Sequence, residues 1–211
     1  MRKNILSGIF LLALLSGPAF AQGRYRQMDI TAGGGLGEGQ VGFNRLENTS
    51  AYSLGYSYWL NDTSTLDVNI SYLMSQYRVV VKEAGEPKSE TLPDWTSLIG
   101  TVGVRYQPAW DFFLDFGFGA GLGYEGWWIK SDVFNNRNGD SPIYYLLMDV
   151  EYPIQPWLSV GLYAEPFYYP LNERLEKRAD IDPAGNVYLD YDKLANSWIV
   201  IGGAWVKVRI Y

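Results

Sequence analysis

The sequence predicts an all-β protein that folds as an eight-stranded antiparallel up-and-down transmembrane β-barrel. The clearest observation is the stretch Phe112–Tyr124, where even positions are apolar and odd positions from Asp115 onward are aspartate or glycine. Only a strand, whose successive side chains point to opposite faces, separates two such sets. The apolar set is seven residues long and has aromatic residues at both ends. This pattern is typical of a lipid-facing strand, in which about 9–11 tilted residues cross the hydrocarbon.

The composition of the chain supports the same fold class. Aromatic residues make up 16% of the chain, with 17 Tyr and 8 Trp, a proportion that suits the aromatic belts at the two surfaces of a membrane. Cys is absent, which excludes a disulfide framework. No segment beyond the N-terminus has 18 consecutive apolar residues, so ordinary transmembrane helices are excluded.

The N-terminus has the pattern of a cleaved secretory signal peptide. Arg2 and Lys3 form a positive region before the apolar segment Ile5–Leu15, which is too short to span a bilayer as a helix. Ala19–Ala21 then has the small-x-small cleavage pattern. We therefore expect a signal peptide at residues 1–21 and a barrel at residues 22–211. Removing Arg2 and Lys3 from the 17 basic residues leaves 15 against 23 acidic ones, a net charge of −8, which predicts no binding of nucleic acid.

The first three strands are expected at Tyr25–Leu36, at Ala51–Leu60 and from Thr65 towards Val81. Each alternates apolar residues with small or polar ones, as a strand with two different faces does. Their apolar faces carry Met28, Ile30, Ala32 and Leu36 in the first strand, Tyr52, Leu54, Tyr56, Tyr58 and Leu60 in the second, and Leu66, Val68, Ile70, Tyr72 and Met74 in the third.

The next three strands are expected at Ser97–Gln107, Phe112–Tyr124 and Ile143–Tyr152. The glycines of the fifth strand leave room for larger side chains from neighbouring strands to fill a narrow lumen. The apolar faces of the fourth and sixth strands carry Leu98, Val102, Val104 and Tyr106, and Tyr144, Leu146, Met148, Val150 and Tyr152.

The last two strands are expected at Leu158–Phe167 and Trp198–Ile210, again with period-two alternation. The seventh places Leu158, Val160, Leu162 and Ala164 outside and Ser159, Gly161, Tyr163 and Glu165 inside. The eighth places Trp198, Val200, Ala204, Val206, Val208 and Ile210 outside and Trp205, Lys207 and Arg209 inside.

Long and short links alternate along the chain. Polar loops are expected at Gly37–Ser50, Lys82–Trp95, Ile129–Asp140 and Leu171–Asn196, and short turns at Asn61–Ser64, Pro108–Asp111 and Pro153–Trp157. Within the last loop, Asp182–Asn186 predicts a hairpin turn that extends the seventh and eighth strands beyond the membrane. Transmembrane barrels have short periplasmic turns and long extracellular loops. We therefore expect both termini in the periplasm and four extracellular loops.

A soluble lipocalin-like barrel with the same number of strands is the alternative fold. The two folds differ in which face of each strand is apolar. A lipocalin needs polar residues at the outward positions Tyr56, Val68, Phe116 and Leu146, which are all apolar. The pattern therefore favours the membrane barrel.

The predicted arrangement resembles the small eight-stranded outer-membrane barrels, the group that includes OmpX, OmpW and the membrane domain of OmpA. The resemblance covers residues 22–211 and rests on architecture. It implies location in the outer membrane, contact with outer-membrane lipid and lipopolysaccharide, and insertion by the barrel-assembly machinery. One departure concerns the C-terminus, because Tyr211 is aromatic but Arg209 and Lys207 occupy the alternate positions before it, where such proteins have apolar residues.

Charged residues gather at inward positions of the predicted strands. An eight-stranded barrel has an interior just wide enough for side chains to fill it, and buried charges without partners are costly, so we expect Arg105 to pair with Asp67 or Asp115. Two interpretations remain open, a structural polar filling and a gate or narrow ion path that depends on re-pairing. The set comprises Asp29, Asp67, Arg105, Asp115, Asp149, Glu151, Glu165, Lys207 and Arg209.

The sequence predicts no catalytic, cofactor-binding or metal-binding residue. His and Cys are both absent, so the usual general base, the usual thiol nucleophile and the usual soft metal ligands are missing. The glycines between Gly117 and Gly123 lie within a strand and precede no helix, so they are not a phosphate loop. We expect no enzyme activity, and a lipid-modifying enzyme ranks last among the functional hypotheses.

The predicted loops at Lys82–Trp95 and Leu171–Asn196 are strongly charged. They are either ordinary solvated surface or a docking surface for an extracellular ligand, since binding residues concentrate on loops held by a rigid scaffold. The first functional hypothesis is therefore a structural or surface-interaction role in the outer membrane. The second is a narrow porin-like channel controlled by the lumen charges.

Overall fold

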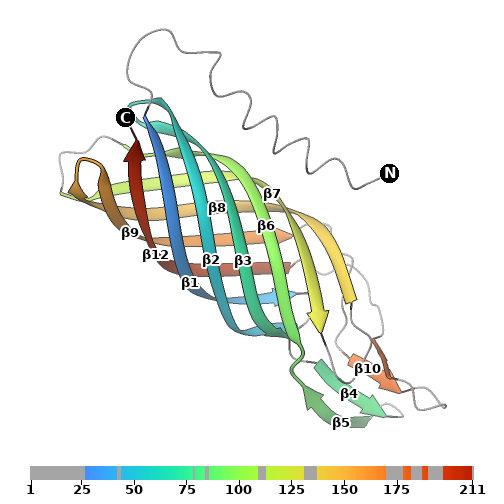
Figure 1. The fold of residues 1–211 in the computed structure, drawn as a ribbon. Coiled ribbons are helices and arrows are strands. Elements are labelled where there is room, and N and C mark those ends of the chain that lie inside the picture. The colour runs from blue at the N-terminus through green and yellow to red at the C-terminus, as the bar shows by residue number, and fades with distance from the viewer. Residues whose placement is uncertain are drawn as a thin grey trace.

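The computed structural model describes residues 27–41, 44–77, 79–83, 86–108, 113–130, 137–169, 178–181, 187–189 and 197–210. Eight of its strands form a closed barrel in the order β1-β12-β9-β8-β7-β6-β3-β2 (Figure 1). The predicted eight-stranded antiparallel barrel is confirmed. Its strands are β1 (Met28–Val41), β2 (Asn44–Asn61), β3 (Ser64–Tyr77), β6 (Asp94–Tyr106), β7 (Asp115–Lys130), β8 (Arg137–Gln155), β9 (Leu158–Tyr169) and β12 (Ser197–Ile210).

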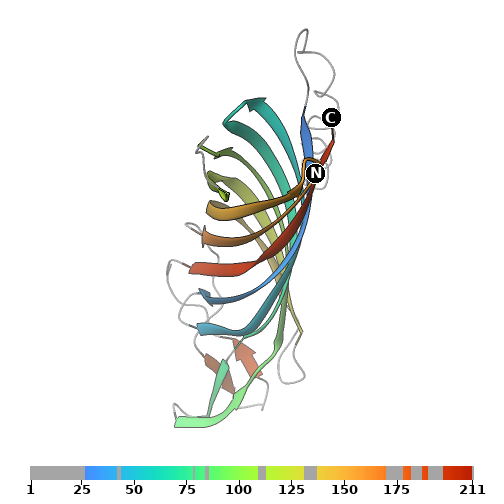
Figure 2. The same ribbon diagram turned by 90° about the vertical axis from the view of Figure 1, so that its left-hand side faces the viewer.

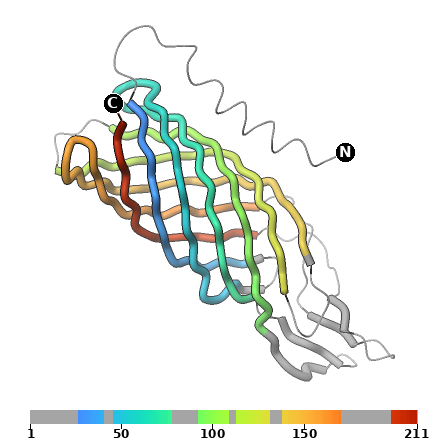
Figure 3. Tube along the Cα trace, in the orientation of Figure 1, coloured from blue at the N-terminus to red at the C-terminus, as the bar shows by residue number. Residues whose placement is uncertain are grey.

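Each barrel strand pairs antiparallel with the barrel strand that precedes it in the chain, and the tube in Figure 3 follows this up-and-down course. Pairing of β1 with β12, from Met28 opposite Ile210 to Gln40 opposite Trp198, closes the barrel. Residues 62–63 and 156–157 turn the chain at one end of the barrel, which we call the turn end. No helix among the described residues is long and apolar enough to cross a membrane.

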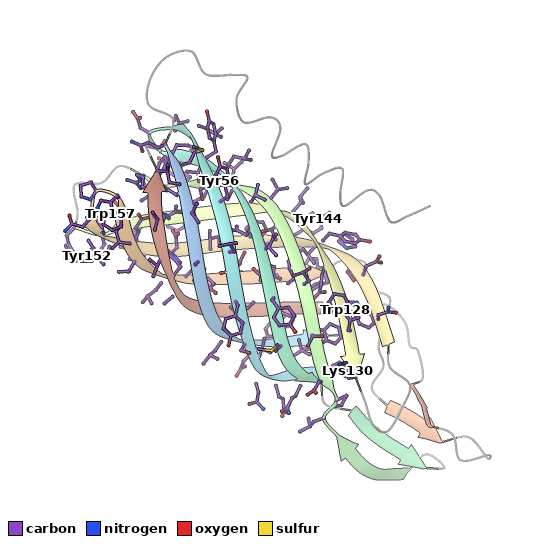
Figure 4. All side chains as sticks on the ribbon, in the orientation of Figure 1. Tyr56, Trp128, Lys130, Tyr144, Tyr152 and Trp157 are labelled. Carbon is purple, nitrogen blue, oxygen red and sulfur yellow. The ribbon has the colours of Figure 1, made fainter. Side chains whose placement is uncertain are left out.

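The outer face of the barrel is apolar, as the period-two pattern predicts. On β7 the side chains of Phe118 and Leu122 are 49% and 55% exposed, whereas Gly117, which precedes Phe118 and lies on the other face, is buried. The lipocalin-like alternative is wrong, because it requires the apolar face to point inward. Exposed aromatic residues lie towards both ends, among them Tyr152 and Trp157 at the turn end and Trp128 and Tyr144 towards the other (Figure 4), as in a membrane protein with interfacial belts.

Four short strands form a second sheet beyond the barrel, at the end away from the turns (Figures 1 and 2). We call this the outer sheet, and the adjacent end of the barrel the sheet end. Its order is β11-β10-β4-β5, with β4 and β10 parallel and both outer pairs antiparallel. The strands are β4 (Val79–Glu83), β5 (Glu86–Thr91), β10 (Arg178–Ile181) and β11 (Val187–Leu189).

The predicted loop Gly37–Ser50 is wrong, because most of it is paired strand. β1 and β2 continue as a hairpin to Val41 opposite Asn44, with a bulge near Gly37 where Asn48 has a φ of 53°. Asparagine tolerates this left-handed conformation better than most residues. The glycines here serve packing, since a Cβ at Gly39 would come within 2.8 Å of Ile199. A glycine-rich composition indicates a loop in many proteins, but in this barrel it makes room for side chains of the neighbouring strand.

The other long links also contain more strand than predicted. Lys82–Trp95 holds the end of β4, all of β5 and the start of β6, and Ile129–Asp140 is shortened from both sides by β7 and β8. The third strand ends at Tyr77 instead of running to Val81 in the barrel, and the fifth begins at Asp115 instead of Phe112.

The hairpin predicted around Asp182–Asn186 has paired flanks, since β10 and β11 are antiparallel neighbours. It does not extend the seventh and eighth barrel strands as predicted, because β10 pairs with β4 in the outer sheet. The turn itself, Tyr25, the predicted signal peptide and Tyr211 lie outside the described residues.

Candidate functional site

The interior of the barrel has two parts of different chemistry. Towards the turn end many inward side chains are charged. Seven of the nine charged residues predicted for the lumen are buried, and Asp115 and Arg209 are half-buried. Towards the sheet end the large inward side chains are mostly apolar, with Glu125 and several serines buried among them. The predicted lumen residues are on β1 (Asp29), β3 (Asp67), β6 (Arg105), β7 (Asp115), β8 (Asp149 and Glu151), β9 (Glu165) and β12 (Lys207 and Arg209).

Glycines provide the space in which large inward side chains lie. A Cβ at Gly161 would collide with the indole of Trp205, and a Cβ at Gly121 would come within 2.5 Å of Tyr145 Cε1. A Cβ at Gly117 would collide with both the guanidinium of Arg105 and the carboxylate of Asp149. The predicted role of the fifth-strand glycines, to make room for side chains of neighbouring strands, is confirmed at Gly117 and Gly121.

Arg105 pairs with the two carboxylates of β8. Its Nη2 lies 2.8 Å from Asp149 Oδ2 and 3.4 Å from Glu151 Oε2, and its Nε donates to Asp149 Oδ1 at 3.2 Å. The guanidinium therefore crosses β7, which lies between β6 and β8 in the barrel. A planar donor group that contacts two acids in a buried site makes strong, directed contacts.

The predicted partners of Arg105, Asp67 and Asp115, are wrong as ion-pair partners. Asp67 accepts a hydrogen bond from Thr65 Oγ1 at 2.8 Å. The register explains the difference, because Arg105 stands opposite Gly119 on β7 and opposite Thr65 on β3, not opposite either acid. With glycine beside it, the long side chain reaches past β7 to the next strand.

Glu151 is the centre of the charged cluster at the turn end. Its Oε2 accepts a hydrogen bond from Lys207 Nζ at 2.5 Å, and its Oε1 lies 3.8 Å from Arg209 Nη2. Together with Arg105, three cations therefore surround one buried carboxylate, at separations where attraction in a low-dielectric interior is strong. We call Arg105, Asp149, Glu151 and Lys207 the lumen cluster.

Arg209 extends this arrangement to β1. Its Nε donates to Asp29 Oδ1 at 3.2 Å, and the Trp59 indole N–H donates to Asp29 Oδ2 at 3.0 Å. The guanidinium carbon also lies 5.3 Å from the centre of the Trp59 ring, within the range of a cation–π contact. These contacts bind the two strands that close the barrel to each other and to β2.

Three acids lie apart from these pairs. Within the part of the chain that the structure describes, Asp67, Asp115 and Glu165 make no ion pair. Asp115 lies at the start of β7 near the turn end, whereas Asp67 and Glu165 line an internal cavity of about 60 Å³. The structure therefore brings the predicted charges together towards the turn end, but these three acids line cavities beside the paired groups and do not enter the ion pairs.

Sequence reasoning missed the filling of the sheet end. Fourteen buried apolar residues form one cluster there and in the middle of the barrel, which we call the apolar plug. Trp95 stacks on Trp127 with ring centres 5.1 Å apart, and Tyr77 packs beside Trp95. The plug comprises Leu46, Ala51, Leu73, Tyr77, Trp95, Ile99, Trp127, Ile129, Ile143, Tyr145, Phe167, Tyr169, Ile199 and Ile201.

A signal for the plug was present in the sequence. Near the sheet end the strands are apolar on both faces, as in Trp127–Ile129 and Trp198–Ile201. A continuous apolar run indicates a strand that is covered on both sides. In each run, alternate residues lie on the exposed outer face of the barrel, and the residues between them are buried in its interior.

Glu125 is a buried acid within the plug that sequence reasoning also missed. Its side chain is on the inward face of β7, 1% exposed, and accepts a hydrogen bond from Tyr169 Oη at 3.5 Å. The residue follows Tyr124, where the sequence pattern placed the end of the strand. Extending the period-two alternation of this strand to Lys130 places Glu125 on the inward face.

The described residues contain no group of three or more His, Cys, Asp or Glu that could hold a metal ion. A groove of about 780 Å³ lies on the outer face across β1, β12, β9 and β8, lined largely by apolar residues that include Ala32, Leu162 and Ala204. The groove is therefore part of the exposed apolar outer face of the barrel. A surface of this kind suits contact with acyl chains better than recognition of a polar substrate.

No protein-family model and no curated protein matches the sequence. Solved structures do share its architecture. Neisserial surface protein A superimposes with a TM-score of 0.58 and 12% identity over 86% of this chain and 96% of that one. Ail of Yersinia pestis, in complex with the heparin analogue sucrose octasulfate, gives 0.55 and 11% over 89% and 100%. OprG of Pseudomonas aeruginosa gives 0.52 and 10% over 89% and 98%.

Identities of 10% to 12% show a shared fold and carry no information about ligands. The match nevertheless covers almost all of each of these chains and most of this one, so it concerns the whole barrel. This chain has the fold of the small eight-stranded outer-membrane β-barrel proteins.

Proposed function

We propose that this chain is an integral outer-membrane protein that acts as a surface-interaction scaffold through its outer sheet. In this proposal a signal peptide at residues 1–21 directs export, the termini and the turn end face the periplasm, and the sheet end faces outward. The apolar outer face supports membrane residence, because a soluble protein rarely exposes such a continuous apolar surface.

The observation that carries the proposal is the parallel pairing of β4 with β10. β4 belongs to the connection between the third and fourth barrel strands, and β10 belongs to the connection between the last two. Arg178–Asp180 pair with Val80–Lys82, so backbone hydrogen bonds join two segments about a hundred residues apart into one sheet. A preformed surface loses less conformational freedom on binding than two separate loops would.

The filled lumen supports this proposal over the channel alternative. Conduction requires a continuous polar path, whereas the apolar plug fills the sheet end with aromatic and aliphatic side chains. In the described part of the lumen, the cluster at the turn end is also closed by short ion pairs. The interior of an eight-stranded barrel is just wide enough for side chains such as these to fill it.

The charge of the long connections favours a neutral or cationic partner. Residues 82–94 hold four acidic and two basic residues, and residues 171–196 hold six acidic and four basic ones. Ail was solved with a sulfated ligand, but these connections carry a net negative charge that repels sulfate groups. We therefore propose a partner of a different class from that ligand, such as a basic protein surface.

A cell-adhesion experiment tests the proposal. Bacteria expressing the intact barrel are compared with bacteria expressing a variant in which residues 79–91 are replaced by a short Gly-Ser linker. Both are exposed to cultured epithelial cells and to bacteria that lack the protein. We expect the intact barrel to increase attachment to one of these surfaces and the linker variant to lose the increase.

A matched control variant replaces the exposed turn residue Asp62 with asparagine, at the opposite end of the barrel. This variant should attach like the wild type. Attachment that is equal for the wild type and the linker variant, at equal surface amounts of heat-modifiable barrel, would contradict a role for the outer sheet. A lipid-modifying activity has no supporting group among the described residues and remains the lowest-ranked alternative.

A further inference from the structure

The internal cavity of about 60 Å³ lies at the centre of the lumen, between the apolar plug and the lumen cluster. Its walls are polar and come from opposite sides of the barrel, with Asp67 on β3 and Glu165 on β9, which are four positions apart in the closed strand order. An ordered water needs about 10–15 Å³ of such space. The cavity therefore has room for an ion with a few waters.

Glu165 is the unusual group in this cavity. Its residue is 8% exposed and lines the cavity, and among the described residues its carboxylate makes no ion pair. Asp67 is 5% exposed and has Thr65 as its hydrogen-bond donor among the described residues. Two buried carboxyl groups therefore face the same small space across the barrel, and neither has a cationic side chain paired with it.

The basic residues that line the cavity are already engaged. Arg105 pairs with Asp149 and Glu151, and Lys207 pairs with Glu151. Arg105 also attracts Asp67 at longer range, whereas no cationic side chain among the described residues compensates the charge of Glu165. Burial of a charge without a partner is very costly, so such a site must gain a counter-charge or lose the charge.

Neutral oxygen atoms complete the site. Ser53, Asn69 and Tyr163 line the same cavity, and carboxylate, amide and hydroxyl oxygens are the ligands that hard cations prefer. We propose that this cavity is a cation site, in which Glu165 and Asp67 bind one hard cation of the Na⁺ or Ca²⁺ class together with these neutral oxygens. The bound cation links β3 to β9 across the lumen.

Terbium luminescence gives a direct test, because Tb³⁺ replaces hard cations at oxygen sites and is sensitised by a nearby indole. Trp205 lines the cavity. Tb³⁺ added to the folded full-length barrel in detergent should give sensitised emission that saturates and that Ca²⁺ competes away. Glu165→Gln and Trp205→Phe should each lose most of this emission, whereas Asp62→Asn on the exposed turn should retain it.

Thermal unfolding in matched salts distinguishes the cation from a proton. The wild type is heated in NaCl, in CaCl₂ and in N-methylglucamine chloride at equal ionic strength, the last having a cation too large for the cavity. We expect the midpoint to rise with the logarithm of the Na⁺ or Ca²⁺ concentration, and Glu165→Gln to abolish this rise. If Glu165→Gln fails to fold, Asp67→Asn serves as the second variant, with the same expectation.

Two results would overturn the proposal. If Tb³⁺ emission and the salt dependence of the unfolding midpoint are equal in the wild type and Glu165→Gln, the cations bind to acidic residues on the surface and not in the cavity. A wild-type midpoint that is the same in all three salts, with no saturable Tb³⁺ emission, would mean that a proton neutralises the cavity. Neither result bears on the outer sheet, so the proposed surface function is tested separately.

Discussion

Arg105 and Asp149 form an ion pair of 2.8 Å across an intervening strand, and Gly117 on that strand leaves the space for it. The two side chains come from β6 and β8, which are not neighbours in the barrel. A contact of this kind joins three strands at once. The contact requires the cation of Arg105, the carboxylate of Asp149 and the absence of a side chain at Gly117.

Removing the guanidinium should destabilise the barrel. Arg105→Ala leaves Asp149 and Glu151 buried with less compensation, and loss of one partner of a buried pair costs about 3–5 kcal/mol. Lys88→Ala, in β5 of the outer sheet, is the control and should have little effect on barrel unfolding. Thermal unfolding in detergent, followed by the heat-modifiable gel shift, measures both. Equal and negligible effects would show that the charged interior is hydrated.

Adding a single methyl group at position 117 should disturb the same ion pair. In Gly117→Ala the new Cβ meets both Arg105 and Asp149, and overpacking of this kind costs about 1–3 kcal/mol. Gly100→Ala is a matched control, because a Cβ there has nothing within 4 Å. The double variant Gly117→Ala/Arg105→Ala should lose less unfolding free energy than the sum of the losses in the two single variants, since both substitutions disrupt one contact. Full additivity would argue against the shared cause.

The apolar plug should contribute more to stability than the lipid-facing surface beside it. Ile199 is 0% exposed inside the barrel and Val200, the next residue, is 39% exposed outside. Ile199→Ala leaves a cavity in a packed interior, at a cost of about 2–5 kcal/mol. Val200→Ala leaves a gap that lipid can fill, because acyl chains are as apolar as the side chain. Urea unfolding in lipid vesicles compares the two, and an equal cost for both would contradict a tightly packed plug.

Proline in the central part of the outer sheet should separate the two long connections without affecting the barrel. Ala179 pairs with Val81 on β4 and with Leu189 on β11, and proline removes a backbone donor from a strand that is paired on both sides. We expect Ala179→Pro to increase cleavage by trypsin at the basic residues of residues 171–196, with an unchanged heat-modifiable shift. Pro87 is native in the edge strand β5, so proline as such is tolerated in this sheet.

The alternation of apolar residues was sufficient to predict the strands and their outward faces. It predicts Phe118 and Leu122 outside and Gly117 inside because a strand allows only these two directions. Gly37 and Gly39 were misinterpreted because composition alone does not distinguish a flexible loop from a strand position that must accept Ile201 and Ile199. The β4–β10 pairing joins distant segments, and such contacts have no local signal.

The partner of Arg105 could not be predicted from strand spacing. Its neighbours on β7 are glycines, so the side chain bypasses the adjacent strand, and the choice of Asp149 depends on the register of three strands together. Glu125 and the plug had a signal in runs such as Trp127–Ile129, which are apolar on both faces. That signal requires the fold to be known before it can be interpreted.

Single-channel recording in planar bilayers tests the central claim most directly, namely that the lumen is closed. The account predicts no stable conductance from the wild-type barrel, because the apolar plug and the lumen cluster fill the interior. The double variant Trp95→Ala and Trp127→Ala, which removes the stacked pair from the plug, serves as the comparison for a loosened lumen. Steady, reproducible conductance steps from the wild type would contradict the account and favour the channel.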